Sequence, residues 1–204
     1  MTNLSPWLLC LSILCLVACR PASLSEIPAQ DDASRLLQLK EEKTHLDSLF
    51  LIQKSQLPVY GQLRDADSLI NVDLSDWNPE IVRTFWPLVD TLGRIRAVTE
   101  SPVSESGDWV ITFTHYFDSV GHTFAFERKT SFYNSICTPD LAHEVRTQFF
   151  APDGVQLDSA YHLSDAEGKS LQRSECQFPY DYPYTPAPTQ ADYWATHRLP
   201  IQPK

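Results

Sequence analysis

The chain has 204 residues, which is enough for one domain with a sizeable hydrophobic core. It carries 26 acidic and 16 basic residues, giving a formal net charge of −10 at pH 7. Binding to nucleic acid requires lysine and arginine against the phosphates, so this balance argues against a nucleic-acid partner. It argues equally against additional electrostatic attachment to anionic lipid.

The first segment is an apolar run over residues 7–18 that ends at a cysteine. The run is too short to span a bilayer, for which roughly 20 apolar residues are needed. Secretory leaders, in contrast, have an apolar core of about 7–15 residues followed by small residues at a cleavage point. No Lys or Arg precedes the run, which departs from the usual leader. The segment therefore predicts a leader peptide.

The end of the run, Leu16-Val17-Ala18-Cys19, resembles the lipobox of bacterial lipoproteins. The resemblance implies that residues 1–18 are a signal peptide, and that Cys19 becomes the first mature residue and carries diacylglyceryl and palmitate. The alternatives are plain secretion after cleavage and an uncleaved anchor. The residue after Cys19 is arginine and not the aspartate that favours inner-membrane retention in enteric lipoproteins. We therefore expect a lipid anchor in the outer membrane of a Gram-negative envelope, with the domain facing the periplasm or the exterior.

The remaining cysteines point to an oxidising compartment. Cys10 and Cys15 leave with the leader and Cys19 is the acyl acceptor, so Cys137 and Cys176 are the two thiols that are left. In an exported protein such a pair is more often bridged than free. We expect a disulfide between them, the alternative being two buried thiols too far apart to join.

After the leader, residues 19–32 contain two prolines and no periodicity, which predicts a flexible tether. A helix is expected from about Ala33 to Gln56, capped by Asp31 or Asp32 and ended by Pro58. Its apolar residues recur at spacings of three, four and seven: Leu36, Leu39, Leu46, Leu49 and Phe50. Packing on a sheet is favoured over a coiled coil, which needs three or four uninterrupted heptads.

A repeated turn motif marks the second half of the chain. Four segments combine Asp with Gly, because Asp can bond nearby backbone amides and glycine adopts positive φ without penalty. The predicted turns are Asp90 to Gly93, Asp118 to Gly121, Asp153-Gly154 and Asp165 to Gly168. Strands are expected between them at Phe85–Val89, Arg94–Thr99, Trp109–Phe117, His122–Tyr133, Glu144–Phe150 and Val155–Leu163, with another near Ser170–Cys176.

These elements predict an α+β fold, in which one N-terminal amphipathic helix packs on a curved antiparallel meander sheet of six to seven strands. The segment Pro79–Leu92 has a helical alternative, since Asn78 could cap a helix with Pro79 in its first position. The single domain is expected to cover residues 33–177. Residues 178–204, which alternate proline with tyrosine, form a tail whose aromatics either pack on the sheet or present a ligand to a partner.

No motif in the sequence indicates catalysis, a cofactor or a metal. The six histidines lack zinc-site spacing, although His115 and His122 flank one hairpin loop. Each Asp-Gly turn also offers too few carboxylates for calcium. The favoured function is a non-enzymatic envelope lipoprotein that binds another envelope protein or component, with the oligomeric state left open. The alternative is a binder of small hydrophobic ligands, with a cavity between helix and sheet lined by residues such as Trp109, Tyr116 and Phe149.

Overall fold

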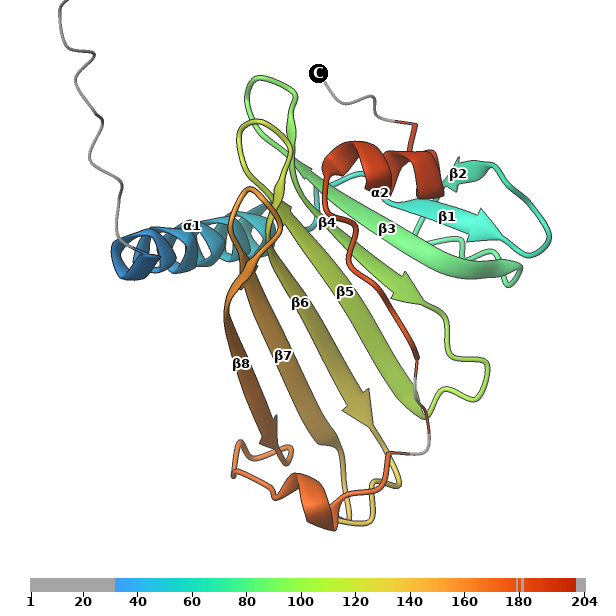
Figure 1. The fold of residues 1–204 in the computed structure, drawn as a ribbon. Coiled ribbons are helices and arrows are strands. Elements are labelled where there is room, and N and C mark those ends of the chain that lie inside the picture. The colour runs from blue at the N-terminus through green and yellow to red at the C-terminus, as the bar shows by residue number, and fades with distance from the viewer. Residues whose placement is uncertain (1–31, 179, 181, 201–204) are drawn as a thin grey trace, which may run out of the picture. The chain divides into compact units, whose positions relative to one another are not determined.

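One antiparallel sheet of eight strands forms the centre of the molecule, in the order β2-β1-β3-β4-β5-β6-β7-β8 (Figure 1). The computed structural model describes residues 32–178, 180 and 182–200, and these residues belong to one compact unit. The elements are α1 (Asp32–Gln53), β1 (Tyr60–Leu63), β2 (Leu69–Asn71), β3 (Ile81–Val89), β4 (Ile95–Pro102), β5 (Trp109–Phe117), β6 (Thr123–Phe132), β7 (Ala142–Phe150), β8 (Gln156–Ser164), η1 (Arg173–Glu175) and α2 (Gln190–His197).

The α+β class and the antiparallel sheet are confirmed, but the expected number of six to seven strands is wrong. Two short strands, β1 and β2, extend the sheet beyond β3. The segment Pro79–Leu92 contains strand β3 and not a helix. Near Ser170–Cys176 the structure has an isolated bridge from Ser170 to Ser164 and the 3-10 helix η1 in place of a strand.

The two faces of the sheet are covered by different parts of the chain, as Figure 1 shows. Helix α1 covers one face, on which a single row of side chains crosses five strands. This row consists of Leu88, Ala97, Tyr116, Ala125 and Phe149, which are paired in register from β3 to β7. Leu46 of α1 is buried against the row, and Leu36, Leu39, Leu49 and Phe50 pack beside it. The helical spacing read from the sequence therefore marks the side of α1 that faces the sheet.

The opposite face is covered by the C-terminal segment. Tyr182 and Tyr184 pack against the phenylalanines of β5 and β6, and Tyr193 and Leu199 are buried beside β3 to β5. Of the two interpretations of the Pro/Tyr-rich segment 178–204, packing on the sheet describes Tyr182, Tyr184, Tyr193 and Leu199. Helix α2 was not expected from the sequence. Thr189 caps this helix by accepting a hydrogen bond from the amide of Asp192.

Cys137 and Cys176 are joined by a disulfide with an S–S distance of 2.05 Å. The bridge ties the loop between β6 and β7 to the chain beyond β8, where Cys176 lies in a small apolar cluster with Ala142 and Leu163.

The predicted leader, Cys19 and the tether up to residue 31 lie outside the described residues. Asp32, expected to be the last residue of the tether or the helix cap, is the first residue of α1. Among the residues that the structure describes, no helix is long and apolar enough to cross a membrane.

Candidate functional site

A cleft of about 620 Å³ lies between the C-terminal half of α1 and the sheet. One wall is made by α1 and the floor by β3, β4, β5 and β6. The lining residues are Leu46, Asp47, Phe50, Leu51 and Lys54 of α1, with Thr84, Trp86, Ala97, Thr99, Ser101, Thr112, Thr114, Tyr116 and Lys129 of the sheet. The cleft is a candidate binding site because it is concave and carries both aromatic and hydrogen-bonding groups.

Strand periodicity places hydroxyl groups along the floor of the cleft. Side chains two residues apart share a face, and Thr99 with Ser101 on β4 lies beside Thr112 with Thr114 on β5. The hydroxyls of Thr99 and Thr114 are 3.0 Å apart and bonded to each other. Neither Thr84 nor Thr112 has a side-chain hydrogen bond within the described part of the chain, so both hydroxyls are available to a ligand.

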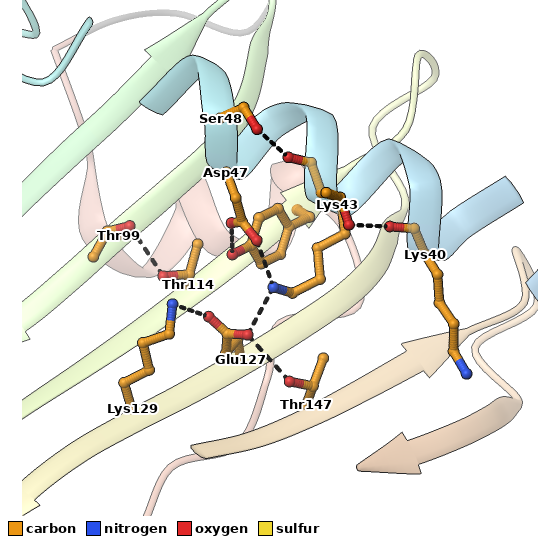
Figure 2. A network of polar contacts seen from close by, with 11 residues as sticks. Lys40, Lys43, Asp47, Ser48, Thr99, Thr114, Glu127, Lys129 and Thr147 are labelled. Atoms are coloured by element: carbon orange, nitrogen blue, oxygen red, sulfur yellow. Dashed lines mark hydrogen bonds and ion pairs between the residues drawn. The ribbon is translucent and has the colours of Figure 1, made fainter. Parts of the chain in front are cut away.

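A polar network anchors α1 to the sheet beside the cleft (Figure 2). The Lys43 ammonium lies 2.9 Å from Asp47 Oδ2 and 2.7 Å from Glu127 Oε2. Glu127 also contacts Lys129 Nζ at 2.6 Å, and its Oε2 accepts a hydrogen bond from the Thr147 hydroxyl. The Tyr116 hydroxyl donates to Asp47 Oδ1 at 2.6 Å.

These contacts fix the charges of the network. Burial disfavours the ammonium of Lys43, but Glu127 and Asp47 outweigh it and raise the pKa of Lys43. Burial likewise opposes ionisation of Glu127, yet Lys43 and Lys129 hold the pKa of Glu127 below its usual range. Burial together with the neighbouring carboxylates raises the pKa of Tyr116. At neutral pH Lys43 and Glu127 are therefore both charged, while Tyr116 stays a hydrogen-bond donor.

A second polar cluster lies on the opposite face, beneath the C-terminal segment. Glu100 of β4 is fully buried, and its Oε1 lies 3.0 Å from Arg83 Nη1. Its other oxygen accepts hydrogen bonds from the hydroxyls of Tyr184, at 2.8 Å, and Tyr193, at 3.3 Å. His197 Nε2 lies 3.5 Å from the same oxygen. Three residues of the C-terminal segment thus converge on one carboxylate, which makes this cluster a fastening point for that segment.

Two histidines on this face, the buried His115 and the half-buried His197, are held neutral. Burial, assisted by His197, lowers the pKa of His115 to about 3. Burial, assisted by Arg83, lowers the pKa of His197 to about 4. Burial also raises the pKa of Glu100, against the opposing effect of Arg83 and the tyrosine hydroxyls. His115 Nε2 accepts a hydrogen bond from the Ala187 amide at 3.0 Å, so its role is to hold the C-terminal backbone.

The residues singled out in the sequence are distributed over several places. Of the three residues expected to line a helix–sheet cavity, Tyr116 lines the cleft. Phe149 is buried beneath α1, and Trp109 lies on the other face against Tyr180 and Tyr182. Within the described ranges there is no group of three or more His, Cys, Asp or Glu side chains suited to a metal ion.

Sequence reasoning missed the hydroxyl floor and the Glu100 cluster. The floor had a readable signal, the alternation of Thr99 with Ser101 and of Thr112 with Thr114. Glu100 had none, because its partners come from positions 83 and 184 to 197, far apart in the chain.

Comparison with known proteins gives no match: no family model fits the sequence, and neither a curated protein nor a solved structure is similar to the chain.

Proposed function

We propose that the protein is a lipid-anchored, non-enzymatic binding protein of the outer membrane, whose sheet domain binds another envelope protein or component. The observation that carries the proposal is the tetrapeptide Leu16-Val17-Ala18-Cys19, with its small residue directly before the cysteine. The disulfide between Cys137 and Cys176 supports it, since such bonds persist in the oxidising compartments that exported proteins occupy.

Anchoring through Cys19 is strong enough to hold the domain permanently. Each buried methylene of an acyl chain contributes about 0.8 kcal/mol, so one chain binds reversibly while two or three bind almost irreversibly. Twelve residues lie between Cys19 and Asp32, where α1 begins. Fully extended, that length reaches at most about 45 Å, which keeps the domain near the membrane.

The anchor is tested by Cys19→Ser in the full chain. We expect the variant to keep its leader and to leave the outer-membrane fraction, because serine offers no thiol for acylation. Mass spectrometry of the mature wild-type chain should show an acylated Cys19 at the N-terminus. Cys15→Ser, which changes a cysteine inside the apolar run, is the matched control and should fractionate as wild type. Unchanged processing and fractionation of Cys19→Ser would refute the anchor.

The cleft beside α1 favours a second candidate function, the binding of a small ligand. Its size suits a ligand of a few rings or residues. The side chain of Trp86 offers an apolar face, and Thr84, Thr112 and Lys129 offer hydrogen bonds. This lining favours a sugar or a short peptide of the envelope over the small hydrophobic ligand that the sequence suggested as an alternative.

Thermal-shift measurements test the second candidate with envelope oligosaccharides, short peptides and fatty acids as probes. We expect stabilisation by an oligosaccharide or a peptide, and its loss in Thr112→Val, which removes one hydroxyl from the cleft. Thr185→Val, an exposed threonine of the C-terminal segment, is the control. Stabilisation by fatty acids alone, or a Thr112→Val variant that responds like wild type, would contradict a polar ligand in this cleft.

A further inference from the structure

The four predicted Asp-Gly turns adopt one common geometry. In each, the amide of the turn's first residue donates to the carbonyl four residues on, and the glycine amide donates to the carbonyl three residues back. The glycines at 93, 121, 154 and 168 all have φ between 75° and 91°, a conformation that favours glycine. In each turn the aspartate Oδ1 accepts a hydrogen bond from the amide two residues on, which belongs to Leu92, Val120, Val155 or Glu167.

Three of these turns lie at one end of the sheet. They connect β3 to β4, β5 to β6 and β7 to β8, and alternate connections of an antiparallel meander emerge at the same end (Figure 1). Neighbouring strands are about 4.8 Å apart, so successive turns are separated by about 10 Å along this end. The fourth turn, at Asp165 to Gly168, follows the far end of β8 and therefore lies at the opposite end.

The residue two positions after the aspartate differs between the two ends. At the three-turn end it is Leu92, Val120 or Val155, with side chains 63%, 75% and 59% exposed. At the opposite end it is the exposed Glu167. An isolated exposed apolar residue needs no explanation. Here, however, an exposed apolar residue recurs in three turns that lie side by side, as the third residue of the first two turns and directly after the glycine in the last.

Helix α1 crosses the sheet close to this end. Lys40 is paired with Asp158, two residues after β8 begins, and Glu42 with Arg96, one residue after β4 begins. Further along α1, His45 and Gln53 line a small pocket together with Asp90 and Thr91 of the first turn. The part of α1 from Lys40 to Gln53 therefore lies close to the three turns.

We propose that Leu92, Val120 and Val155 form a membrane-contacting edge that inserts into the interfacial region of the bilayer. This inference rests on the proposed lipid attachment at Cys19, because three such side chains are enough to orient an anchored domain and too few to anchor it. The aspartates suit that position, since each already satisfies the amide of its apolar neighbour, which would otherwise lack a partner on leaving water. The acidic surface also excludes attraction to anionic lipid as the orienting force.

Quenching of a fluorophore by nitroxide-labelled lipid tests whether this edge contacts the membrane. A single cysteine is introduced by Val120→Cys or by Glu167→Cys and labelled with an environment-sensitive fluorophore, while the two other mature cysteines remain bridged. The acylated protein is reconstituted into vesicles of phosphatidylethanolamine and phosphatidylglycerol that contain nitroxide-labelled lipid. Glu167→Cys is the matched control because it occupies the same position of the same turn at the opposite end.

We expect quenching at position 120 to be several-fold stronger than at position 167, with a blue-shifted emission at position 120 only. Equal quenching at the two positions would overturn the edge. A second arm separates this result from the fate of the lipid anchor: residues 1–19 are replaced by a hexahistidine tag and the chain is held on vesicles by a nickel-chelating lipid. If Cys19 proves not to be acylated, the proposed anchor fails, and the second arm still decides whether the turns contact the bilayer.

Discussion

At the scale of single residues, Glu100 is the side chain on which three residues of the C-terminal segment converge. It has no exposed surface, and its partners are one arginine and two tyrosine hydroxyls. A buried ion pair is a weak source of net stability when intact, but removing one partner leaves an uncompensated charge inside the protein. The cluster therefore fixes where the C-terminal segment lies more than it strengthens the fold.

We predict that Glu100→Ala lowers the free energy of unfolding by about 3 kcal/mol, because the half-buried Arg83 loses its ion pair and two tyrosine hydroxyls lose their acceptor. Urea denaturation monitored by tryptophan fluorescence measures the change. Glu105→Ala serves as the control, since Glu105 pairs with Arg64 in solvent and such pairs contribute little. Equal losses in the two variants would show that Glu100 has no special role.

His115 and His197 predict a pH dependence. Their pKa values in the folded chain, about 3 for His115 and about 4 for His197, lie below the ordinary value of 6.5. At pH values between the folded and the unfolded pKa, the unfolded chain binds more protons than the folded chain. The contribution of the two neutral histidines to stability is therefore complete above pH 6.5 and is lost as the pH falls. Nuclear magnetic resonance should find both rings neutral at pH 5. A titration midpoint above pH 6 for His115 would contradict its buried position.

At the scale of elements, α1 is held on the sheet by an apolar stripe and by one buried lysine. Lys43 reaches Glu127 of β6 and Asp47 of its own helix, with its side chain 11% exposed. Lys40, one turn earlier, also pairs with the sheet, but its side chain is 46% exposed. The two lysines thus allow a buried ion pair to be compared with a solvated ion pair on the same helix.

Replacing Lys43 with alanine should destabilise the fold by about 3 kcal/mol, because Asp47 and Glu127 lose the cation between them. Lys40→Ala should cost far less, since solvent screens its pair with Asp158. Thermal unfolding followed by circular dichroism distinguishes the two. A Lys40→Ala variant as unstable as Lys43→Ala would mean that the buried position of Lys43 is irrelevant.

The elements that the sequence predicted well carry strong local signals. The leucine spacing located α1 within three residues at its C-terminal end, and the Asp-Gly turns separated β3 from β4, β5 from β6 and β7 from β8. β1 and β2 were missed because strands of four and three residues are too short for a periodic pattern. Helix α2 was missed because the neighbouring prolines suggested extended chain. The cleft and the Glu100 cluster combine residues from distant strands, which local pattern does not reveal.

At the scale of the whole molecule, two long-range ties complete the domain: the C-terminal segment across one face and the disulfide at one end of the sheet. The bridged cysteines are 39 positions apart in the chain. Closing a loop of this length restricts the unfolded chain and stabilises the folded one by about 4 kcal/mol on the chain-entropy model.

Cys176→Ser should lower the free energy of unfolding by roughly this amount, about 2–5 kcal/mol, as is usual for native bridges of exported domains. Denaturation of the wild type with and without a reducing agent provides an independent measure of the same quantity. If reduction leaves the urea midpoint unchanged, the bridge contributes nothing to stability in solution.

The fastening of Tyr184, Tyr193 and His197 onto Glu100 has a consequence for how the polypeptide matures. Contacts that join strand β4 to positions 84 to 97 residues later form slowly, since a long stretch must first be brought together. A chain that is translocated N-terminus first delivers these positions last. The phenylalanine-rich side of the sheet consequently stays uncovered until these positions arrive. If the chain is exported as proposed, a folding helper in the receiving compartment would find its target there.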